Sequence, residues 1–594
     1  MLSRSSIAVA LAVAGLSAQA AAQALNARVQ ETLMGPRVQG GRGPVAYMSE
    51  DGDHLAIVAA KGSRQVMVID GVEGPVFDEI PLPFAWNSMS AYRNVGATIV
   101  FSSTGGHSAY VGRRGGDFIA VVDGKEASTL STPQTQQAAA GSDPTGWTFM
   151  FSPDGSRLAY AALEAGGWVM VTDGVKSAAY RGFDLHQAVL NGKRLIYVAQ
   201  TADQKWHAVV DGKPGPAFDQ IGGLKVTTDG AHYAFIATRR ANASMSQTVV
   251  VDGVEGPVEK NISDLEQAPD GRVSYMAMRP QTSAGGNPPH LIAGGLDLPW
   301  TTTFGTGVAA GPAPQYHVAW SPDGKRFACV QMNNPNPGVT VLVNGKAMGP
   351  TYRSANQLSW SPDGSRLAYL AVAENGTYLV IDGEESAGVN WVKEFQWSSD
   401  GKHYAYSAGT STGIVVMVDG KEQSKSMGPI SSLRFSPDGK HIAYGAQTTV
   451  SGYQPMVDGA LKPHYLGNFA TRVQGNLPVT SPQFFFSPDG SRLAYVGGKL
   501  DRSDKLGVWV DGVSEAGPLP SYFHPAWSPD SRHFAAVTSD GSGKWVIMVD
   551  GKLGPPFEDI LVLNDASARF TTPHTYRYYT FKGAEIYRVT LELN

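Results

Sequence analysis

Histidine and aspartate are the residues of this chain that could most readily do acid–base or metal chemistry. Six of its 13 histidines stand at one place in a recurring pattern, directly after a turn: His54, His107, His232, His403, His441 and His533. Other copies of the pattern carry arginine there, as at Arg157, Arg326, Arg366 and Arg492. An exchange of histidine for arginine is typical of a half-exposed strand start. We therefore expect a structural role for these histidines and no metal site.

Two short motifs match catalytic or nucleotide-binding signatures only in part. Residues 409–413 read Gly-Thr-Ser-Thr-Gly, the pattern of a hydrolase nucleophile elbow. That chemistry needs a sharp turn into a helix and a base within reach of the serine, whereas the flanking residues here predict a hairpin loop. Ser542-Gly543-Lys544 lacks the earlier glycine and the following hydroxyl of a phosphate-binding loop. We expect no catalytic residue, no cofactor and no metal.

Cys329 is the only cysteine. A single thiol cannot form a bridge within the chain. In the recurring pattern it takes the place that Tyr160 and Tyr369 take in other copies. This position predicts a buried packing residue and not a reactive thiol.

These residues belong to a repeat that is marked by Ser-Pro-Asp-Gly. Intact copies begin at residues 152, 321, 361, 436 and 487, degenerate copies at 49, 227, 268, 398 and 528, and weaker ones lie near Gly105 and Gly192. The 12 units are spaced 37 to 53 residues apart. Proline second and glycine fourth suit a type I turn.

Each unit has the same internal order of short strands. An aromatic or apolar residue precedes the turn, and a strand such as Arg157-Leu158-Ala159-Tyr160 follows it. A further strand ends in Asp-Gly, as at Val209-Val210-Asp211-Gly212, which is a strong hairpin signal. Four short antiparallel strands every 40 to 45 residues are the signature of a propeller blade. The predicted fold class is therefore all-β, with tandem propellers of four-stranded blades.

The units resemble the WD40-like (PD40) repeats of the TolB-type β-propeller, which also occur in the propeller of prolyl oligopeptidase-like enzymes. The resemblance rests on the sequence aromatic-Ser-Pro-Asp-Gly-x-Arg-Leu-Ala-Tyr and covers most of the chain. We find neither the α/β domain that precedes the TolB propeller nor the hydrolase domain of the oligopeptidases. The resemblance implies a propeller and leaves the function open.

The two ends of the chain complement each other. Met34-Gly35-Pro36 resembles the fourth-strand sequence Met348-Gly349-Pro350, while Arg569 to Leu593 reads as two or three strands with no fourth. We predict a thirteenth blade that both ends build together, which removes an exposed sheet edge. Unit six is irregular, so we expect a boundary between a first propeller at 25–305 and a second at 306–594, each of six or seven blades. Residues 566–594 are a candidate for closing the first.

Charge and the first residues bear on partners and location. The net charge is −5, with 47 Lys and Arg against 52 Asp and Glu, which argues against a nucleic-acid binder. Residues 1–24 read as a signal peptide, with Arg4 before an apolar stretch and small residues after it. No later stretch is long enough to span a membrane. We expect a periplasmic or secreted protein.

A partner site is expected on the propeller face that carries the loops of variable length. In the first half of the chain these loops are basic, and Arg113, Arg114, Arg239 and Arg240 are the candidate contacts, with Trp86 and Trp391 as exposed aromatics. The leading interpretation is a non-catalytic scaffold that binds a protein or peptide of the cell envelope, an anionic segment being one candidate. A propeller hydrolase or lyase with a central-channel site and a carbohydrate-binding protein stay open as alternatives.

Overall fold

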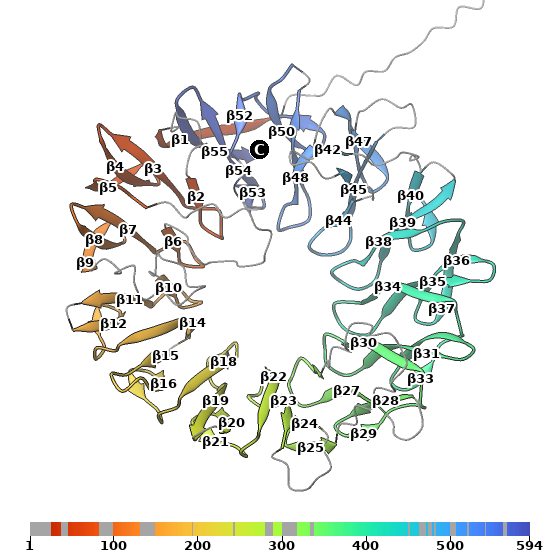
Figure 1. Ribbon diagram of the computed structural model, residues 1–594. Coiled ribbons are helices and arrows are strands. Elements are labelled where there is room, and N and C mark those ends of the chain that lie inside the picture. Colours follow the sequence, from red (N-terminus) through yellow and green to blue (C-terminus); the bar gives the residue numbers. More distant parts are fainter. Residues whose placement is uncertain are drawn as a thin grey trace, which may run out of the picture.

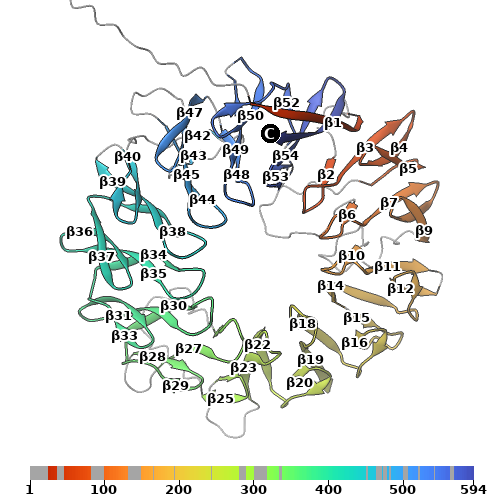
Figure 2. The same cartoon turned by 180° about the vertical axis from the view of Figure 1, so that it is seen from behind.

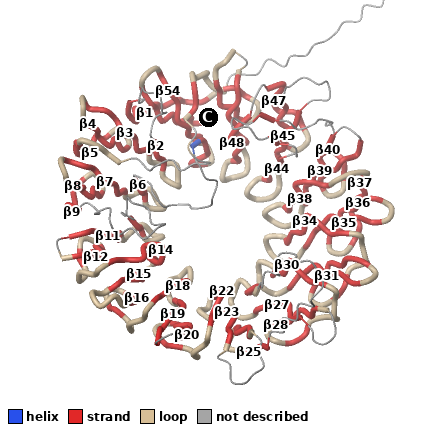
Figure 3. Tube along the Cα trace, in the orientation of Figure 1, coloured by secondary structure: helices blue, strands red, loops and turns tan. Residues whose placement is uncertain are grey.

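The computed structural model describes residues 25–593, without 37–45, 82–98, 131–148, 165, 193, 242–243, 280–288, 300–317, 333–337, 450–451, 463–470, 473–477, 480–482, 499–505, 520–521, 541, 562 and 564–566. Its regular elements are strands, and no α-helix occurs among the described residues. Figure 3 accordingly shows strands and loops with one short blue segment, and the only described residue of helical conformation is Ser567, which is 3₁₀. The predicted signal peptide, residues 1–24, lies outside the described residues.

Twelve four-stranded sheets, here blades 1 to 12, follow one another along the described chain. Blades 1 to 4 consist of β2 (Ala46–Met48), β3 (Leu55–Lys61), β4 (Arg64–Ile69) and β5 (Val72–Phe77); β6 (Ile99–Phe101), β7 (Ser108–Arg114), β8 (Asp117–Val122) and β9 (Lys125–Leu130); β10 (Phe149–Phe151), β11 (Leu158–Glu164), β12 (Gly167–Thr172) and β13 (Val175–Lys176); and β14 (Gly182–Asn191), β15 (Arg194–Gln200), β16 (Trp206–Val210) and β17 (Lys213–Pro214). Blades 5 to 8 consist of β18 (Gln220–Val226), β19 (Tyr233–Ala241), β20 (Ser244–Val251) and β21 (Val254–Glu255); β22 (Asn261–Gln267), β23 (Val273–Met278), β24 (His290–Ala293) and β25 (Leu296–Pro299); β26 (Ala319–Trp320), β27 (Phe327–Met332), β28 (Val339–Val343) and β29 (Lys346–Ala347); and β30 (Ser354–Trp360), β31 (Leu367–Ala373), β32 (Gly376–Ile381) and β33 (Glu384–Glu385). Blades 9 to 12 consist of β34 (Trp391–Trp397), β35 (Tyr404–Thr410), β36 (Gly413–Val418) and β37 (Lys421–Ser426); β38 (Ile430–Phe435), β39 (Ile442–Thr449), β40 (Gly452–Val457) and β41 (Ala460–Leu461); β44 (Gln483–Phe486), β45 (Leu493–Gly498), β46 (Leu506–Val510) and β47 (Val513–Leu519); and β48 (Tyr522–Trp527), β49 (Phe534–Ser539), β50 (Trp545–Val549) and β51 (Lys552–Leu553). A small two-stranded sheet pairs β42 (Thr471–Arg472) with β43 (Pro478–Val479).

A thirteenth sheet, blade 13, is built from both ends of the chain, as predicted. Its order is β1 (Ala27–Pro36), β55 (Glu585–Leu593), β54 (Thr575–Lys582) and β52 (Asp559–Ile560), and β53 (Ala568–Thr572) also pairs with β54. The N-terminal strand β1 is the outermost strand, antiparallel to β55 with Ala27 opposite Leu593. Blade 13 shares an apolar core with blade 12 on one side and with blade 1 on the other.

The thirteen sheets lie around a single ring, with the first strand of each blade nearest the axis (Figures 1 and 2). This corrects the expectation of two separate propellers divided between residues 305 and 306. The expected boundary itself lies outside the described residues, but blades 6 and 7 on either side of it share a core that joins Met276, Leu291 and Ala293 to Phe327, Cys329 and Leu342. The Trp320 indole of blade 7 also donates to Ser274 Oγ of blade 6 at 3.2 Å. The irregular unit 6 therefore marks a change in the repeat and not the end of a ring.

The antiparallel order gives the ring two different faces. The turns between first and second strands and between third and fourth strands lie on one face, here the turn face. The hairpins between second and third strands and the links between blades lie on the other, here the hairpin face. This arrangement follows from strand order alone, because successive antiparallel strands end on alternate sides.

In ten of the blades one aspartate joins the two turns on the turn face. In blade 8, Asp382 accepts hydrogen bonds from the Leu367 backbone N–H at 2.8 Å and from Arg366 Nε at 3.2 Å. Its backbone has φ of 53°, a left-handed conformation that asparagine and aspartate tolerate. We call this arrangement the aspartate latch. The same backbone contact recurs at Asp70, Asp123, Asp173, Asp211, Asp252, Asp419, Asp458, Asp511 and Asp550.

The histidines of the repeat are members of these latches, which confirms their structural role. His403 Nδ1, for example, lies 2.7 Å from Asp419 Oδ2, and each of the other five has the same partner in its own blade. Arginine at this position also reaches the next blade. Arg326 stacks 4.5 Å from the Trp360 ring, and Arg366 and Arg492 stack on Trp397 and Trp527 in the same way. The exchange of histidine for arginine thus follows the aromatic residue of the neighbouring blade.

Latch variants in blade 8 test this reading. Asp382→Ala removes the acceptor of a buried strand N–H and strains the left-handed turn, so we expect the free energy of unfolding to fall by about 1–3 kcal/mol. Asp382→Asn keeps the acceptor, as Asn344 does naturally in blade 7, and we expect a loss of less than about 1 kcal/mol. Equilibrium urea unfolding measures both, with exposed Glu384→Ala as the control. Equal losses for the two Asp382 variants would contradict the latch.

Cys329 is buried in the core between blades 6 and 7, as its place in the repeat predicts. Burial raises the pKa of the thiol to about 12, and the thiolate is the reactive form. We expect the native protein to resist a thiol reagent such as DTNB at pH 8 and to react with one equivalent once unfolded in urea. Rapid labelling of the native protein would contradict the buried assignment.

Candidate functional site

The arginines predicted to contact a partner lie on the hairpin face, at the ends of second strands. Arg113 and Arg114 end β7 in blade 2, while Arg239 and Arg240 lie near the end of β19 in blade 5. Most of the variable loops that were expected around them, including residues 82–92 and 131–147, lie outside the described residues, as does Trp86. The described part of the face nevertheless shows what these arginines contact.

Each of the two arginines of blade 2 has a carboxylate partner. Arg113 donates through Nε and Nη2 to Glu79 Oε2, at 3.0 and 2.6 Å. Arg114 donates to both carboxylate oxygens of Glu126 and stacks 5.0 Å from the centre of the Phe77 ring. All four charged side chains are between 40% and 51% exposed. Pairs of this kind contribute little to stability and can exchange partners at small cost.

Blade 5 repeats the arrangement. Arg239 donates to both oxygens of Glu255, at 2.6 and 2.7 Å, and lies 4.5 Å from the Phe218 ring of blade 4. The hydrogen-bonded guanidinium lowers the pKa of Glu255. Arg240 contributes its backbone N–H, which donates to Asp219 Oδ2 at 2.7 Å. The predicted basic patch is therefore balanced by acids, and blades 2 and 5 are separate sites on the ring (Figure 1).

An acid that the sequence analysis passed over explains part of this balance. It directly follows the phenylalanine of a Gly-Pro-x-Phe sequence in blades 1, 4 and 12, as Asp78, Asp219 and Glu558. Each accepts a hydrogen bond from a backbone N–H in or beside the second hairpin of the next blade, from Gly115, Arg240 and Gly583 respectively. The signal was present in the sequence as a recurring Phe-Asp or Phe-Glu pair. Its role depends on a contact between blades, which no single repeat shows.

A cavity of about 280 Å³ opens on the hairpin face between blades 4 and 5. It is lined by Asp184, Trp206, Asp219, Gln220 and Ile221. Lys205 Nζ donates to Asp219 Oδ1 at 2.6 Å, and this hydrogen bond is the main cause of a lowered pKa of Asp219. The cavity thus combines a half-buried indole with ionised groups of both signs, a composition that suits a polar ligand with an apolar part.

A second cavity, of about 350 Å³, is lined by residues of blades 12 and 13. Its lining includes Phe557 and Glu558, which correspond to Phe218 and Asp219, together with Lys544, Lys582 and Tyr578. Trp545 and Trp206 both begin a third strand and pair by an isolated bridge with these phenylalanines. The pairing of tryptophan with phenylalanine is thus shared by blades 4 and 12, while the two cavities have different linings.

Two other candidates, Trp391 and residues 409–413, contact neighbouring parts of the fold. Trp391 is half-buried, its ring lies against Gly409 of the adjacent strand, and Lys393 Nζ is 5.3 Å from the ring centre. Residues 409–413 form the β35–β36 hairpin that the sequence predicts, with Thr410 opposite Gly413.

In the part of the chain that the structure describes, no group of three or more His, Cys, Asp or Glu side chains is arranged to hold a metal ion. Within the same residues, no helix has the length and apolar character needed to cross a membrane.

Similarity of this chain to known proteins is found among solved structures. No family model matches the chain, and no curated protein matches it. Solved structures that are similar include a eukaryotic initiation factor (13% identity, 59% of this chain and 89% of that chain, TM-score 0.27), TolB from Acinetobacter baumannii (16%, 45% and 63%, 0.19) and the β-propeller domain of the Trilobed protease from Pyrococcus furiosus (13%, 48% and 97%, 0.22). TolB is thus among the structural neighbours, as is a β-propeller domain of a protease.

Proposed function

We propose that this protein is an exported, non-catalytic propeller scaffold that binds a protein or peptide of the cell envelope on its hairpin face. The observation that carries the proposal is the cavity between blades 4 and 5, where Trp206 lies beside the Lys205–Asp219 pair. Arg239 and Glu255 of blade 5 provide a second pair on the same face. A rigid sheet scaffold that holds an aromatic residue among exposed charges is suited to recognise a polypeptide.

The charge balance of the face defines the kind of partner. The side chains of Arg113, Arg114 and Arg239 are already paired, so a purely anionic segment would have to displace Glu79, Glu126 or Glu255. A segment with both acidic and basic side chains could instead exchange partners with the exposed pairs, and such an exchange costs little. We therefore expect a partner segment of mixed charge, with one apolar or aromatic side chain that enters the cavity beside Trp206.

Site-specific photocrosslinking in the native host tests the proposal. A photoreactive residue at position 245, an exposed site opposite Arg240 on the hairpin face, should crosslink one defined protein, whereas the same residue at position 402 on the turn face should not. The double variant Arg239→Glu/Arg240→Glu should reduce the crosslink at least about fivefold, because reversed charges cost binding energy at a contact. The matched control Lys402→Glu/Lys440→Glu, which reverses two exposed turn-face charges, should leave it unchanged.

The same experiment can contradict the proposal. Equal crosslinking from positions 245 and 402, or a crosslink that survives Arg239→Glu/Arg240→Glu, would remove the hairpin face as the site. Export is tested separately by the mass of the protein recovered from its host. We expect a chain that begins at Ala21 or Leu25, the positions after the two candidate cleavage sites.

A further inference from the structure

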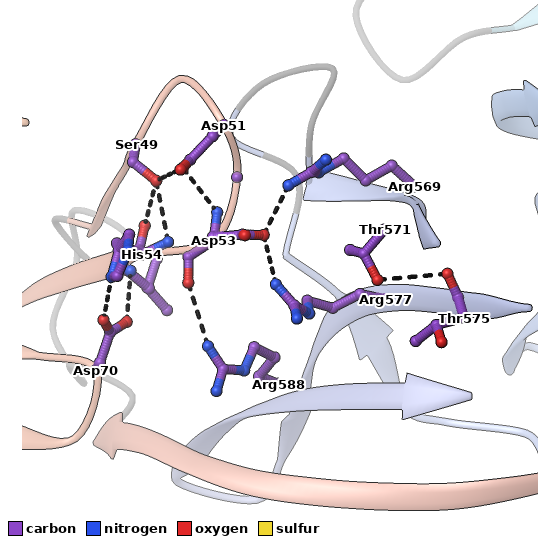
Figure 4. A network of polar contacts seen from close by, with 12 residues as sticks. Ser49, Asp51, Asp53, His54, Asp70, Arg569, Thr571, Thr575, Arg577 and Arg588 are labelled. Atoms are coloured by element: carbon purple, nitrogen blue, oxygen red, sulfur yellow. Dashed lines mark hydrogen bonds and ion pairs between the residues drawn. The ribbon is translucent and has the colours of Figure 1, made fainter. Parts of the chain in front are cut away.

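Three arginines of blade 13 gather on the sheet surface that meets blade 1. Arg569 of β53 stands directly opposite Arg577 of β54, and Arg588 of β55 stands opposite Tyr579 of β54. Arg577 and Tyr579 are two residues apart and therefore point to the same side of the sheet. All three guanidinium groups consequently share one surface, close to the place where the ring closes (Figure 4).

A single carboxylate lies among them. Asp53, in the first turn of blade 1, accepts hydrogen bonds at Oδ1 from Arg569, at 2.6 Å, and from Arg577. Arg588 donates to the Asp53 backbone carbonyl at 3.2 Å (Figure 4), and among the described residues it has no carboxylate as an ion-pair partner. The nearby Asp70 is already held by His54 Nδ1 and the Leu55 N–H. Three positive charges thus face one negative charge in this cluster.

Two hydrogen-bond donors of the cluster also lack an acceptor among the described residues. The Nε atoms of Arg569 and Arg577 are buried, and neither has a hydrogen-bond partner among the described residues. Like charges directly opposite in a sheet are destabilising unless something compensates them. The side chains of Arg569, Arg577 and Asp53 are 31%, 21% and 38% exposed, so the cluster is reached from solvent.

We propose that Arg569, Arg577 and Arg588 form a binding site for a phosphate group at the junction of blades 13 and 1. Guanidinium groups present planar pairs of donors that match phosphate oxygens, and a dianion supplies the charge that Asp53 alone does not. The site lies on the turn face, opposite the proposed partner surface, and is independent of it. All three arginines belong to the C-terminal strands of blade 13, and the site lies where this blade meets the first turn of blade 1.

Calorimetric titration and thermal melting of the full-length mature protein test the site. Inorganic phosphate should bind and should raise the melting temperature by more than chloride at the same ionic strength, because a ligand of the folded state stabilises it. Arg588→Gln should weaken binding about tenfold or more, since it removes a charge-assisted donor. Arg532→Gln, at an exposed arginine on the turn face of blade 12, is the matched control and should bind as the wild type does.

Asp53→Asn separates a ligand site from a purely structural cluster. It removes the carboxylate that competes with phosphate for Arg569 and Arg577, so phosphate should bind about fivefold more tightly even though the phosphate-free protein is less stable. Weaker binding to Asp53→Asn would overturn the proposal. So would unchanged binding to Arg588→Gln, or an equal effect of phosphate and chloride on the wild type.

A phosphomonoester tests the source of the group. If a phosphoserine peptide binds at least as tightly as inorganic phosphate, the site takes a phosphate group carried by a larger ligand. If only inorganic phosphate binds, the site takes the free ion. Both outcomes support the site, and failure of both ligands to bind would overturn it without affecting the hairpin-face proposal.

Discussion

The interaction on which the ring depends is the hydrogen bond between an aspartate carboxylate and the first backbone N–H of the second strand. Asp382 shows its parts: a left-handed backbone conformation that turns the third strand into the fourth, and one oxygen for Leu367 N–H. The other oxygen takes Arg366, which in turn donates to the Lys402 carbonyl of the next blade. One carboxylate therefore fixes a hairpin, aligns two turns and orients the side chain that reaches across to its neighbour.

These contacts bear on a variation that has no visible order along the sequence, the exchange of histidine for arginine after the first turn of a blade. Where the first strand of the next blade ends in tryptophan, as at Trp320, Trp360, Trp397 and Trp527, the residue after the turn is arginine, and its guanidinium stacks on that indole. Where that strand ends in Phe101 or Phe151, the residue after the turn is histidine, which stacks on the phenyl ring. A cation over an indole gains more than over a phenyl ring. The two positions are thus coupled between blades, although they lie about 40 residues apart.

Much of the fold could be predicted from the repeat, because turns and strand alternation are local. Ser-Pro-Asp-Gly, Asp-Gly and the apolar runs locate the strands, and the complementary ends locate the closing blade. The number of rings could not be predicted this way. It depends on whether blade 7 packs on blade 6, and the apolar residues that decide it, such as Leu291 and Phe327, look the same in either arrangement. The candidate partner arginines were predicted from their residue type. Their pairing with Glu79, Glu126 and Glu255 was not predicted, because those acids lie 12 to 34 residues away in an outer strand or a link.

Closing the ring requires a contact between blades that differs from the contact between two copies of the repeat. Twelve blades dock on their neighbours through equivalent surfaces, but blade 13 must meet blade 1 with strands drawn from both ends of the chain. Its contact differs accordingly: Tyr579 donates to the Gly52 carbonyl, and Asp53 takes the place that Ser156, Lys325 and Lys440 occupy in other turns. An acid at this position suits only a basic neighbour, so blade 1 fits blade 13 better than it fits another copy of the repeat. A single arginine would suffice to pair with Asp53. All three arginines contact Asp53, and together they bring more positive charge than this one carboxylate balances. It is this excess of charge that makes the junction a ligand site as well as a contact between blades.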